Sequence, residues 1–100
     1  MPAPYSLEAH VIAAEGKQLS TNLSGEVVIL GVERGIYYGL SDVGAYVWDL
    51  LATSRRIEDI VIGVVDTFDV SRDVAERDVL ALIASLAEHD LITVDDATDL

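Results

Sequence analysis

The sequence contains no cysteine, a single lysine and no long apolar run. Without cysteine, the chain can form neither a disulfide framework nor a thiol nucleophile nor a thiolate metal site. Although 51% of the residues are hydrophobic, no run reaches the ~18–20 apolar residues that cross a membrane. The segment 1–6 also lacks the basic and apolar regions of a signal peptide. These absences favour a cytoplasmic protein without a membrane partner.

Basic residues are scarce: 6 lysines and arginines stand against 18 acidic residues, which gives a net charge of −12. Affinity for nucleic acids comes mostly from basic side chains that neutralise phosphates. The pair Arg55-Arg56 is too small to offset the acidic balance, so we expect no nucleic-acid partner. The acidic excess is otherwise explained by a charged surface around an apolar chain. With 100 residues, the chain is expected to form one domain over 1–100, ordered over about 10–94.

Short β-prone runs separated by turn residues predict an antiparallel meander in the N-terminal half. Its three strands are expected at Gln18–Leu23, Glu26–Val32 and Gly35–Leu40. A short strand at 10–14 and a poorly ordered start over 1–9 are expected before them. The middle strand is apolar on both faces, which predicts that both of its faces are covered.

The last strand of this meander is predicted to leave one edge of the sheet unprotected. Gly35-Ile36-Tyr37-Tyr38-Gly39-Leu40 contains neither Pro nor Lys, the residues that normally block pairing at an exposed edge. Gly35 ends the hairpin loop that starts at Glu33 and is expected to take a positive φ. Neighbouring strand residues point to opposite faces, so one of the two tyrosines covers the core and the other faces outward. The outward ring either shields the sheet or forms, with the open edge, part of a binding cleft.

Three amphipathic helices are expected after the meander, each marked by apolar residues at helical spacing. The first begins after a cap at Ser41 or Asp42, the second after Arg56, and the third after a cap at Ser71. Their apolar stripes are Val43, Tyr46, Val47, Leu50 and Leu51, with Trp48 beside them; Ile57, Ile60, Val61, Val64, Val65 and Phe68; and Ala75, Val79, Leu82, Ile83 and Leu86. A short strand at 91–94 and an acidic tail over 95–100 follow. This order predicts an α+β, winged-helix-like fold, with an N-terminal three-stranded antiparallel meander followed by three helices.

No catalytic or metal site emerges from the reactive residues. His10 and His89 have no nucleophile and acid at a readable spacing, and His89 is explained by its place near a helix C-terminus. No Gly-rich phosphate loop precedes a helix. The acidic clusters around Asp69 and at 95–99 lack the spacing of an EF-hand. We therefore expect no enzyme activity, no metal and no cofactor.

A series of short motifs follows a characteristic order along residues 18–94. They are Gly25-Glu26, Ile29-Leu30, Gly35-x-Tyr37-Tyr38-Gly39-Leu40, Gly44, Val47-Trp48, Leu50-Leu51, Ile57-Glu58-Asp59-Ile60, Phe68-Asp69-Val70, Asp78-Val79 and Leu91-Ile92. Together these motifs resemble the PqqD-like family of peptide chaperones. The sequence departs from the family pattern at Arg56, where a helix-capping residue is usual.

The resemblance implies a RiPP recognition element, a non-catalytic domain that binds the leader part of a ribosomally made precursor peptide. It implies that the leader adds as a strand to 35–40, beside the third helix, and is delivered to a leader peptidase or other modifying enzyme. The peptide-binding residues that it implies are Gly35, Ile36, Tyr37, Tyr38, Gly39, Leu40, Arg72, Asp73, Glu76, Arg77, Leu80 and Ile83. Freestanding domains with a GxYYGL pattern look most like those of lasso peptide biosynthesis.

Two features of the third helix fit this expectation. Leu80 lies ~100° from the centre of the core stripe, beside the small residues Ala84 and Ala87, and is expected to wall a shallow apolar groove. Arg72 and Arg77 are the candidates for holding an acidic leader side chain.

Three alternatives remain open from the sequence. A PqqD-type partner of a radical SAM enzyme in coenzyme PQQ biosynthesis shares the motifs. A winged-helix DNA-binding regulator shares the element order, although the charge of −12 and the two lone arginines of the third helix weigh against it. The third alternative is a structural subunit of a larger enzyme.

Overall fold

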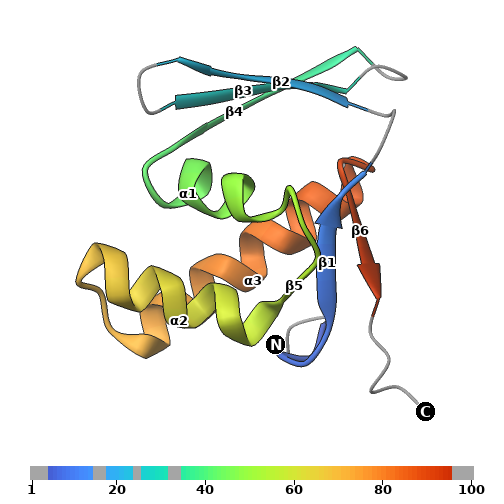
Figure 1. Ribbon diagram of the computed structural model, residues 1–100. Coiled ribbons are helices and arrows are strands. Elements are labelled where there is room, and N and C mark those ends of the chain that lie inside the picture. The colour runs from blue at the N-terminus through green and yellow to red at the C-terminus, as the bar shows by residue number, and fades with distance from the viewer. Residues whose placement is uncertain (1–4, 15–17, 24–25, 32–34, 96–100) are drawn as a thin grey trace.

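The computed structural model describes residues 5–14, 18–23, 26–31 and 35–95, which form two small sheets and three helices (Figure 1). The strands are β1 (His10–Ala13), β2 (Gln18–Leu23), β3 (Glu26–Gly31), β4 (Ile36–Ser41), β5 (Arg55–Arg56) and β6 (Ile92–Asp95). The helices are α1 (Val43–Leu50), α2 (Ile57–Phe68) and α3 (Arg72–Glu88). The predicted α+β class, meander and three helices are confirmed. The predicted hairpin-loop residues Glu33 and Arg34, and the acidic tail beyond residue 95, lie outside the described residues.

The meander has β3 in the centre and β4 at an edge. The pairing of β3 with β4 runs from Gly31 opposite Ile36 to Glu26 opposite Ser41. Gly35 closes the hairpin with a φ of 64°, and its N–H donates to the Gly31 carbonyl at 2.7 Å. Among the described strands, β4 therefore has a neighbour on one side only.

The meander is covered on one face, which corrects the prediction that β3 is covered on both. Val27 and Ile29 are buried, whereas Val28 and Leu30 on the opposite face are only partly buried. All three helices lie on the same side of this sheet (Figure 1). Tyr37 stands opposite Leu30 in the pairing, so the outer apolar surface is shielded by cross-strand neighbours instead of a second layer.

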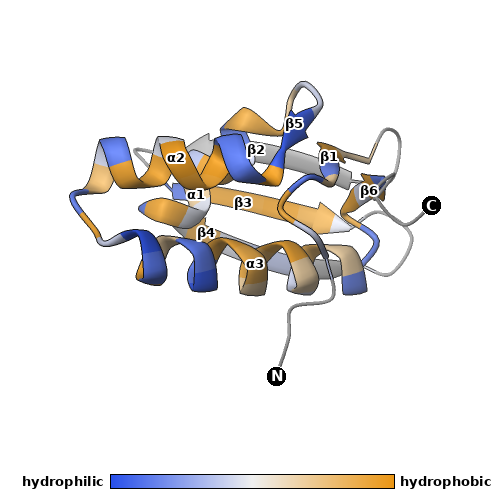
Figure 2. Ribbon diagram, turned by 90° about the horizontal axis from the view of Figure 1, so that it is seen from below, coloured by the Kyte–Doolittle hydropathy of each residue, from blue (hydrophilic) through white to orange (hydrophobic). Residues whose placement is uncertain are grey.

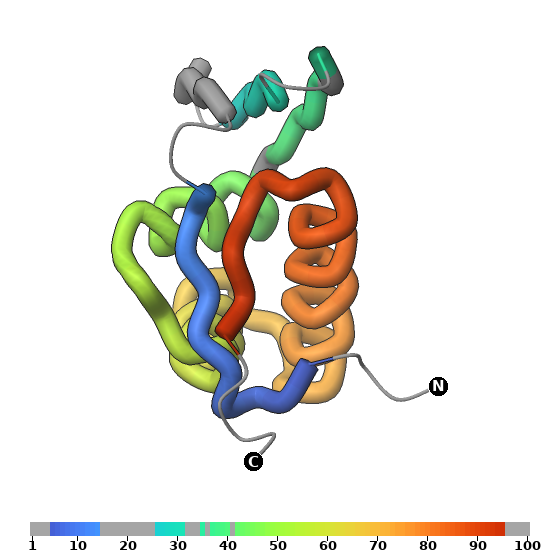
Figure 3. The backbone as a smooth tube through the Cα atoms, turned by 90° about the vertical axis from the view of Figure 1, so that its right-hand side faces the viewer, coloured from blue at the N-terminus to red at the C-terminus, as the bar shows by residue number. Residues whose placement is uncertain are grey.

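The two ends of the chain meet in a second sheet, of order β5–β1–β6, which the sequence did not reveal. β1 pairs antiparallel with β6 over its whole length, from His10 opposite Asp95 to Ala13 opposite Ile92. Figure 3 shows these two strands side by side. The strands at both ends are predicted from their composition, but their pairing is not, and β5 is too short to be recognised from a pattern.

The segment before β1, predicted to be poorly ordered, completes the N-terminus of α2. Ala9 is fully buried. Its carbonyl accepts the Ile57 N–H, and the Leu7 carbonyl accepts the Glu58 N–H, both at 2.9 Å. These amides are among those that a helix leaves free at its start, and Arg56, the N-cap residue, makes no side-chain cap bond. Backbone from the start of the chain therefore supplies the cap that Arg56 lacks.

The first helix buries part of its predicted stripe and, as the sequence predicts, Trp48 beside it. Its buried residues are Ala45, Val47 and Trp48, whereas Val43 and Tyr46 of the predicted stripe are only partly buried. Trp48 is 6% exposed. Its ring is therefore largely buried, beside the fully buried Val47 and Leu51.

The other two helices keep their predicted faces. α2 buries Ile57, Ile60, Val61 and Val64, and α3 buries Ala75, Val79, Ile83 and Leu86. The predicted cap is present in α3, where Ser71 Oγ accepts the Val74 N–H at 3.3 Å, and is absent in α1, where Asp42 makes no side-chain cap bond. Figure 2 shows α1 between α2 and α3 with β3 behind it, so one apolar core joins the helices to the meander.

Candidate functional site

The open edge of the meander meets the C-terminal end of α3. The helix is inclined to the sheet, so that its C-terminal end lies closest to the meander and its N-terminal end farthest (Figure 1, Figure 3). The Tyr38 hydroxyl on β4 hydrogen-bonds the Ser85 hydroxyl on α3. The Tyr38 ring meets His89 edge-on, with 5.6 Å between the ring centroids, and His89 Nδ1 donates to the Ser85 carbonyl at 2.9 Å. These three side chains join the edge strand to the helix.

The two adjacent tyrosines point to opposite faces of β4, as predicted. Tyr38 is partly buried and packs against the core, on the same face as the buried Leu40. Tyr37 is 76% exposed and stands opposite Leu30, on the face away from the helices. Tyr37 therefore faces away from α3, and the ring that faces this helix is the inner one, Tyr38.

Several α3 residues predicted to bind peptide lie away from β4. With about 100° between successive helical residues, Arg72, Glu76 and Leu80 lie about 140–180° around the axis from Ser85. Leu80 is partly buried and packs against the core, and Ile83 is fully buried. The structure therefore does not bring these four side chains to the open edge.

The side of α3 next to β4 is marked by residues that sequence reasoning missed. Ser85 and His89 contact Tyr38. Ala81 lies one turn before Ser85 on the same side of the helix and is exposed. Arg77 lies one turn before Ala81, and its side chain is 74% exposed. Of the predicted α3 residues, Arg77 is thus the one that the structure leaves accessible closest to this side.

The other predicted residues are on β4 or on the first turn of α3. Gly35 and Gly39 are exposed, and so is Asp73. The Leu40 side chain is buried, so only its backbone is available at the edge. The side chain of Ile36 lies outside the part of the structure that is described.

Arg72 is held by acidic neighbours. Its Nη1 donates to Glu58 Oε2 at 3.0 Å, its Nη2 donates to the other Glu58 oxygen at 2.5 Å, and its Nε donates to Glu76 at 3.3 Å. The hydrogen bonds from Arg72 lower the pKa of Glu58, and the same bonds raise the pKa of Arg72. This bidentate pair joins the first turns of α2 and α3. Since its carboxylate partners lie within the protein, Arg72 serves the fold.

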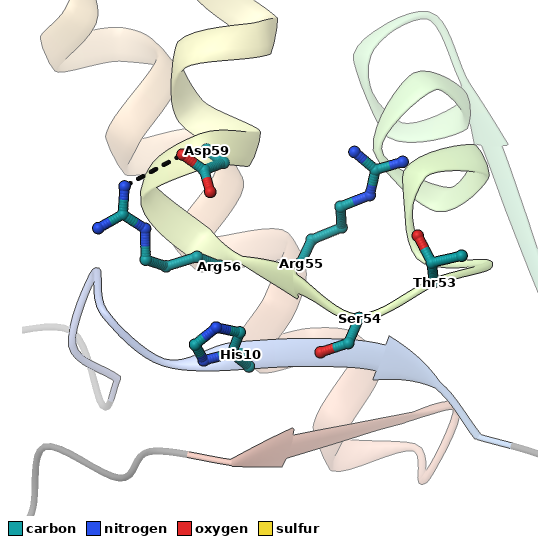
Figure 4. A pocket seen from close by; sticks show the side chains of 6 residues that line it. All are labelled: His10, Thr53, Ser54, Arg55, Arg56 and Asp59. Atoms are coloured by element: carbon teal, nitrogen blue, oxygen red, sulfur yellow. Dashed lines mark hydrogen bonds and ion pairs between the residues drawn. The ribbon is translucent and has the colours of Figure 1, made fainter.

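A separate open pocket of about 490 Å³ lies beside β5 and is lined by His10, Thr53, Ser54, Arg55, Arg56 and Asp59 (Figure 4). The two guanidinium groups point apart in Figure 4. Arg56 pairs with Glu8 at 2.8 Å and with Asp59 at 3.1 Å, whereas Arg55 Nε donates to the Leu50 carbonyl at 3.0 Å. The cationic groups do not converge, so this pocket lacks the geometry of an anion site.

Neither a metal cluster nor a membrane span is found among the described residues. No three His, Asp or Glu side chains of this part of the chain are placed to hold a metal ion. Within the same residues, no helix has both the length and the apolar character needed to cross a bilayer.

Comparison with known proteins places the chain in a family. The family model of coenzyme PQQ synthesis protein D (PqqD) matches residues 26–92. Among solved structures, the chain is similar to TbiB1 in complex with the TbiA(beta) leader peptide, at 32% identity and a TM-score of 0.74, over 81% of this chain and 93% of that one. It is also similar to lasso peptide synthetase B1 complexed with the leader peptide, at 24% identity and a TM-score of 0.70, over 86% of this chain and 98% of that one. No curated protein gives a significant match. The family match covers the meander edge and all three helices, and this chain belongs to the PqqD family.

Proposed function

We propose that this chain is a RiPP recognition element: it binds the leader of a ribosomally made precursor peptide and delivers it to a leader peptidase or other modifying enzyme. It performs no catalysis itself. The observation that carries the proposal is the open edge of β4 beside α3. This open edge occurs in a fold that the chain shares with TbiB1, a 32% identical protein whose structure is a complex with a leader peptide.

The leader adds to β4 as a further antiparallel strand. On an edge strand, alternate residues turn their N–H and C=O groups away from the sheet. A peptide that pairs with these groups gains affinity without a demand for a particular sequence. The segment Gly35–Leu40 supplies this backbone, and every second leader side chain then points toward the side of α3.

Selection of leader side chains takes place on the side of α3 next to β4. Ala81 is small and exposed, so it leaves room for an apolar leader side chain. Arg77 has Asp78 at 3.6 Å as a partner, and its exposed guanidinium can also meet an acidic leader residue. The predicted residues that lie on the other side of α3, or in its core, are left out of the proposed site.

Lasso peptide biosynthesis is the pathway that the similar structures favour. One of them is a lasso peptide synthetase B1 complexed with the leader peptide, and the alignments cover 93% and 98% of the two similar proteins. A PqqD-type partner of a radical SAM enzyme in coenzyme PQQ biosynthesis is the second candidate, which the family match favours. The two candidates share the binding mode and differ in the peptide and in the enzyme that receives it.

Titration with fluorescently labelled leader peptides tests the proposal. The leaders are those of precursor peptides encoded near the gene, together with a PQQ precursor peptide and a scrambled leader. We expect saturable binding to a lasso leader and at least about tenfold weaker binding to the scrambled one. Binding to the PQQ precursor peptide alone would favour the second candidate, and binding to none of them would overturn the proposal.

Two N-methylated versions of the leader provide a matched control for strand addition. One version is methylated at odd positions and the other at even positions. Only one edge of an added strand can pair with β4, so only one of the two versions should lose binding. Equal binding of the two versions would contradict the proposed mode.

Duplex DNA serves as the control ligand. With a net charge of −12, we expect a Kd no tighter than ~10⁻⁴ M at physiological salt. A gel shift at micromolar protein would favour a DNA-binding regulator instead.

A further inference from the structure

Tyr38, Ser85 and His89 form a small polar cluster between the edge strand and α3. The Tyr38 hydroxyl hydrogen-bonds the Ser85 hydroxyl, and the Tyr38 and His89 rings meet edge-on. We propose that this cluster holds β4 at a set distance from α3, so that the groove for the leader exists before the leader arrives. Tyr38 and Ser85 are then positioning residues. This inference rests on the proposed function and adds how its site is kept ready.

The attachment of β4 to the helices occurs at two points along the strand. Leu40 packs against α1, where a Cβ added to Gly44 would come within 3.1 Å of Leu40 Cδ2. Tyr38 lies two residues nearer the hairpin and bonds α3. Because α3 comes near the sheet at its C-terminal end (Figure 1), the Tyr38 contact lies where the strand and the helix approach each other. It therefore fixes the separation of the two surfaces that the leader must touch.

A fixed separation favours binding because it lowers the ordering cost that the peptide must overcome. Loss of one neutral hydrogen bond changes such an equilibrium by about fivefold. The bond is partly buried, so water replaces it only in part. The effect should appear mainly as faster leader dissociation, as is usual for changes at an interface.

Tyr38→Phe is the main test, because it removes the hydroxyl and keeps the ring that packs on His89. We expect leader affinity to fall about fivefold. Ser85→Ala should give a similar loss, and Ser85→Thr, which retains a hydroxyl, should restore most of the affinity. Tyr46→Phe is the matched control: the Tyr46 ring packs edge-on against Phe68 and its hydroxyl lies beside Gly63, both on α2, so this variant should bind the leader like the parent.

The double variant Tyr38→Phe/Ser85→Ala separates positioning from direct contact with the peptide. If the two hydroxyls act only through their mutual bond, the double variant should bind no more weakly than either single variant. Additive losses would overturn the inference, and so would unchanged affinity of Tyr38→Phe.

Hydrogen exchange of the free protein gives a readout that needs no leader. Tyr38→Phe should speed the exchange of β4 amides and leave those of β6 unchanged. Unchanged β4 exchange would overturn the inference on its own. If the parent binds no leader but Tyr38→Phe still speeds the exchange of the β4 amides, the proposed function is wrong and the inference that Tyr38 positions β4 is supported.

Discussion

The two sheets of this molecule each have three strands, but they differ in what covers them. The β5–β1–β6 sheet joins the ends of the chain, and its Val11 and Ile92 are buried in the common core. The meander buries one face through Val27 and Ile29, while its other face and its β4 edge have no described element over them. The β5–β1–β6 sheet is thus part of the packed core, whereas the meander has a face and an edge that no described element covers.

This difference separates the residues that hold the fold from those available to a partner. Among the largest fully buried side chains that are described, only Val27 and Ile29 come from the meander. The others come from the helices, the segment that follows α1 and the ends of the chain. Substitutions of the buried helical residues should therefore change the free energy of unfolding, and substitutions beside β4 should change leader binding.

The largest expected effect is a loss of stability caused by a substitution among the buried residues of the helices. Trp48→Ala should lower the free energy of unfolding by ~3–5 kcal/mol, because it removes a large side chain that is 6% exposed and leaves a cavity. Urea melts measure this loss. Ile62→Ala is the matched control on α2: its side chain is 48% exposed, so the change should stay within ~0.5 kcal/mol. A loss below ~1 kcal/mol for Trp48→Ala would show that the ring is not a main support of the core.

A second, smaller effect is expected in binding. Ala81→Trp should weaken leader binding at least about tenfold, because an indole would fill the space beside β4. Unfolding in urea should change little, since Ala81 is exposed. Ile62→Trp, at an exposed helical position on α2, should bind the leader like the parent. Parent-like binding by Ala81→Trp would mean that the leader does not cross this side of α3.

Charge reversal on the same helix should matter less. Arg77→Glu is expected to weaken binding of an acidic leader by at most about fivefold, because exposed ion pairs contribute little. The loss should shrink at high salt. Arg55→Glu changes the net charge equally on β5 and should have no such effect. An equal loss in both variants would assign the effect to net charge and not to contact with Arg77.

The smallest effect concerns acid stability. Hydrogen bonds from Arg72 hold the pKa of Glu58 below its ordinary value of 4.5, so the folded state releases this proton more readily than the unfolded chain. The stabilising contribution of the pair is then present above the ordinary pKa and is lost as pH falls through the lowered one. Urea midpoints of the parent and Glu58→Gln should differ at pH 7 and converge at acid pH. A difference of the same size at both pH values would contradict this linkage.

The sequence predicts those parts of the fold that depend on local patterns. Alternation, turn residues and helical spacing predict the meander, its open edge and the starts of α2 and α3. The second sheet depends on pairing between the two ends of the chain, which no local pattern records. The capping of α2 by the Ala9 and Leu7 carbonyls is not predicted for the same reason, so the sequence alone shows Arg56 only as a departure from the usual capping residue.

On β4 the structure has the open edge that the sequence predicts, whereas on α3 most of the predicted side chains lie on a different side from β4. The sequence predicts a role for Leu80 because this residue lies beside the core stripe, but a helix has two such sides. Which side faces β4 depends on how the helix is rotated and tilted in the packed molecule. The sequence does hold one hint, because Ser85 and His89 place two polar groups one turn apart beside the apolar stripe.

Hydrogen exchange with and without bound leader tests strand addition most directly. The amides of Ile36–Ser41 that face β3 are protected in the free protein by the meander pairing. On leader binding, the account predicts new protection at the alternate amides that face the open edge, with no change in β6. Binding that leaves the β4 amides unchanged, or that protects only the β5–β1–β6 sheet, would contradict the account.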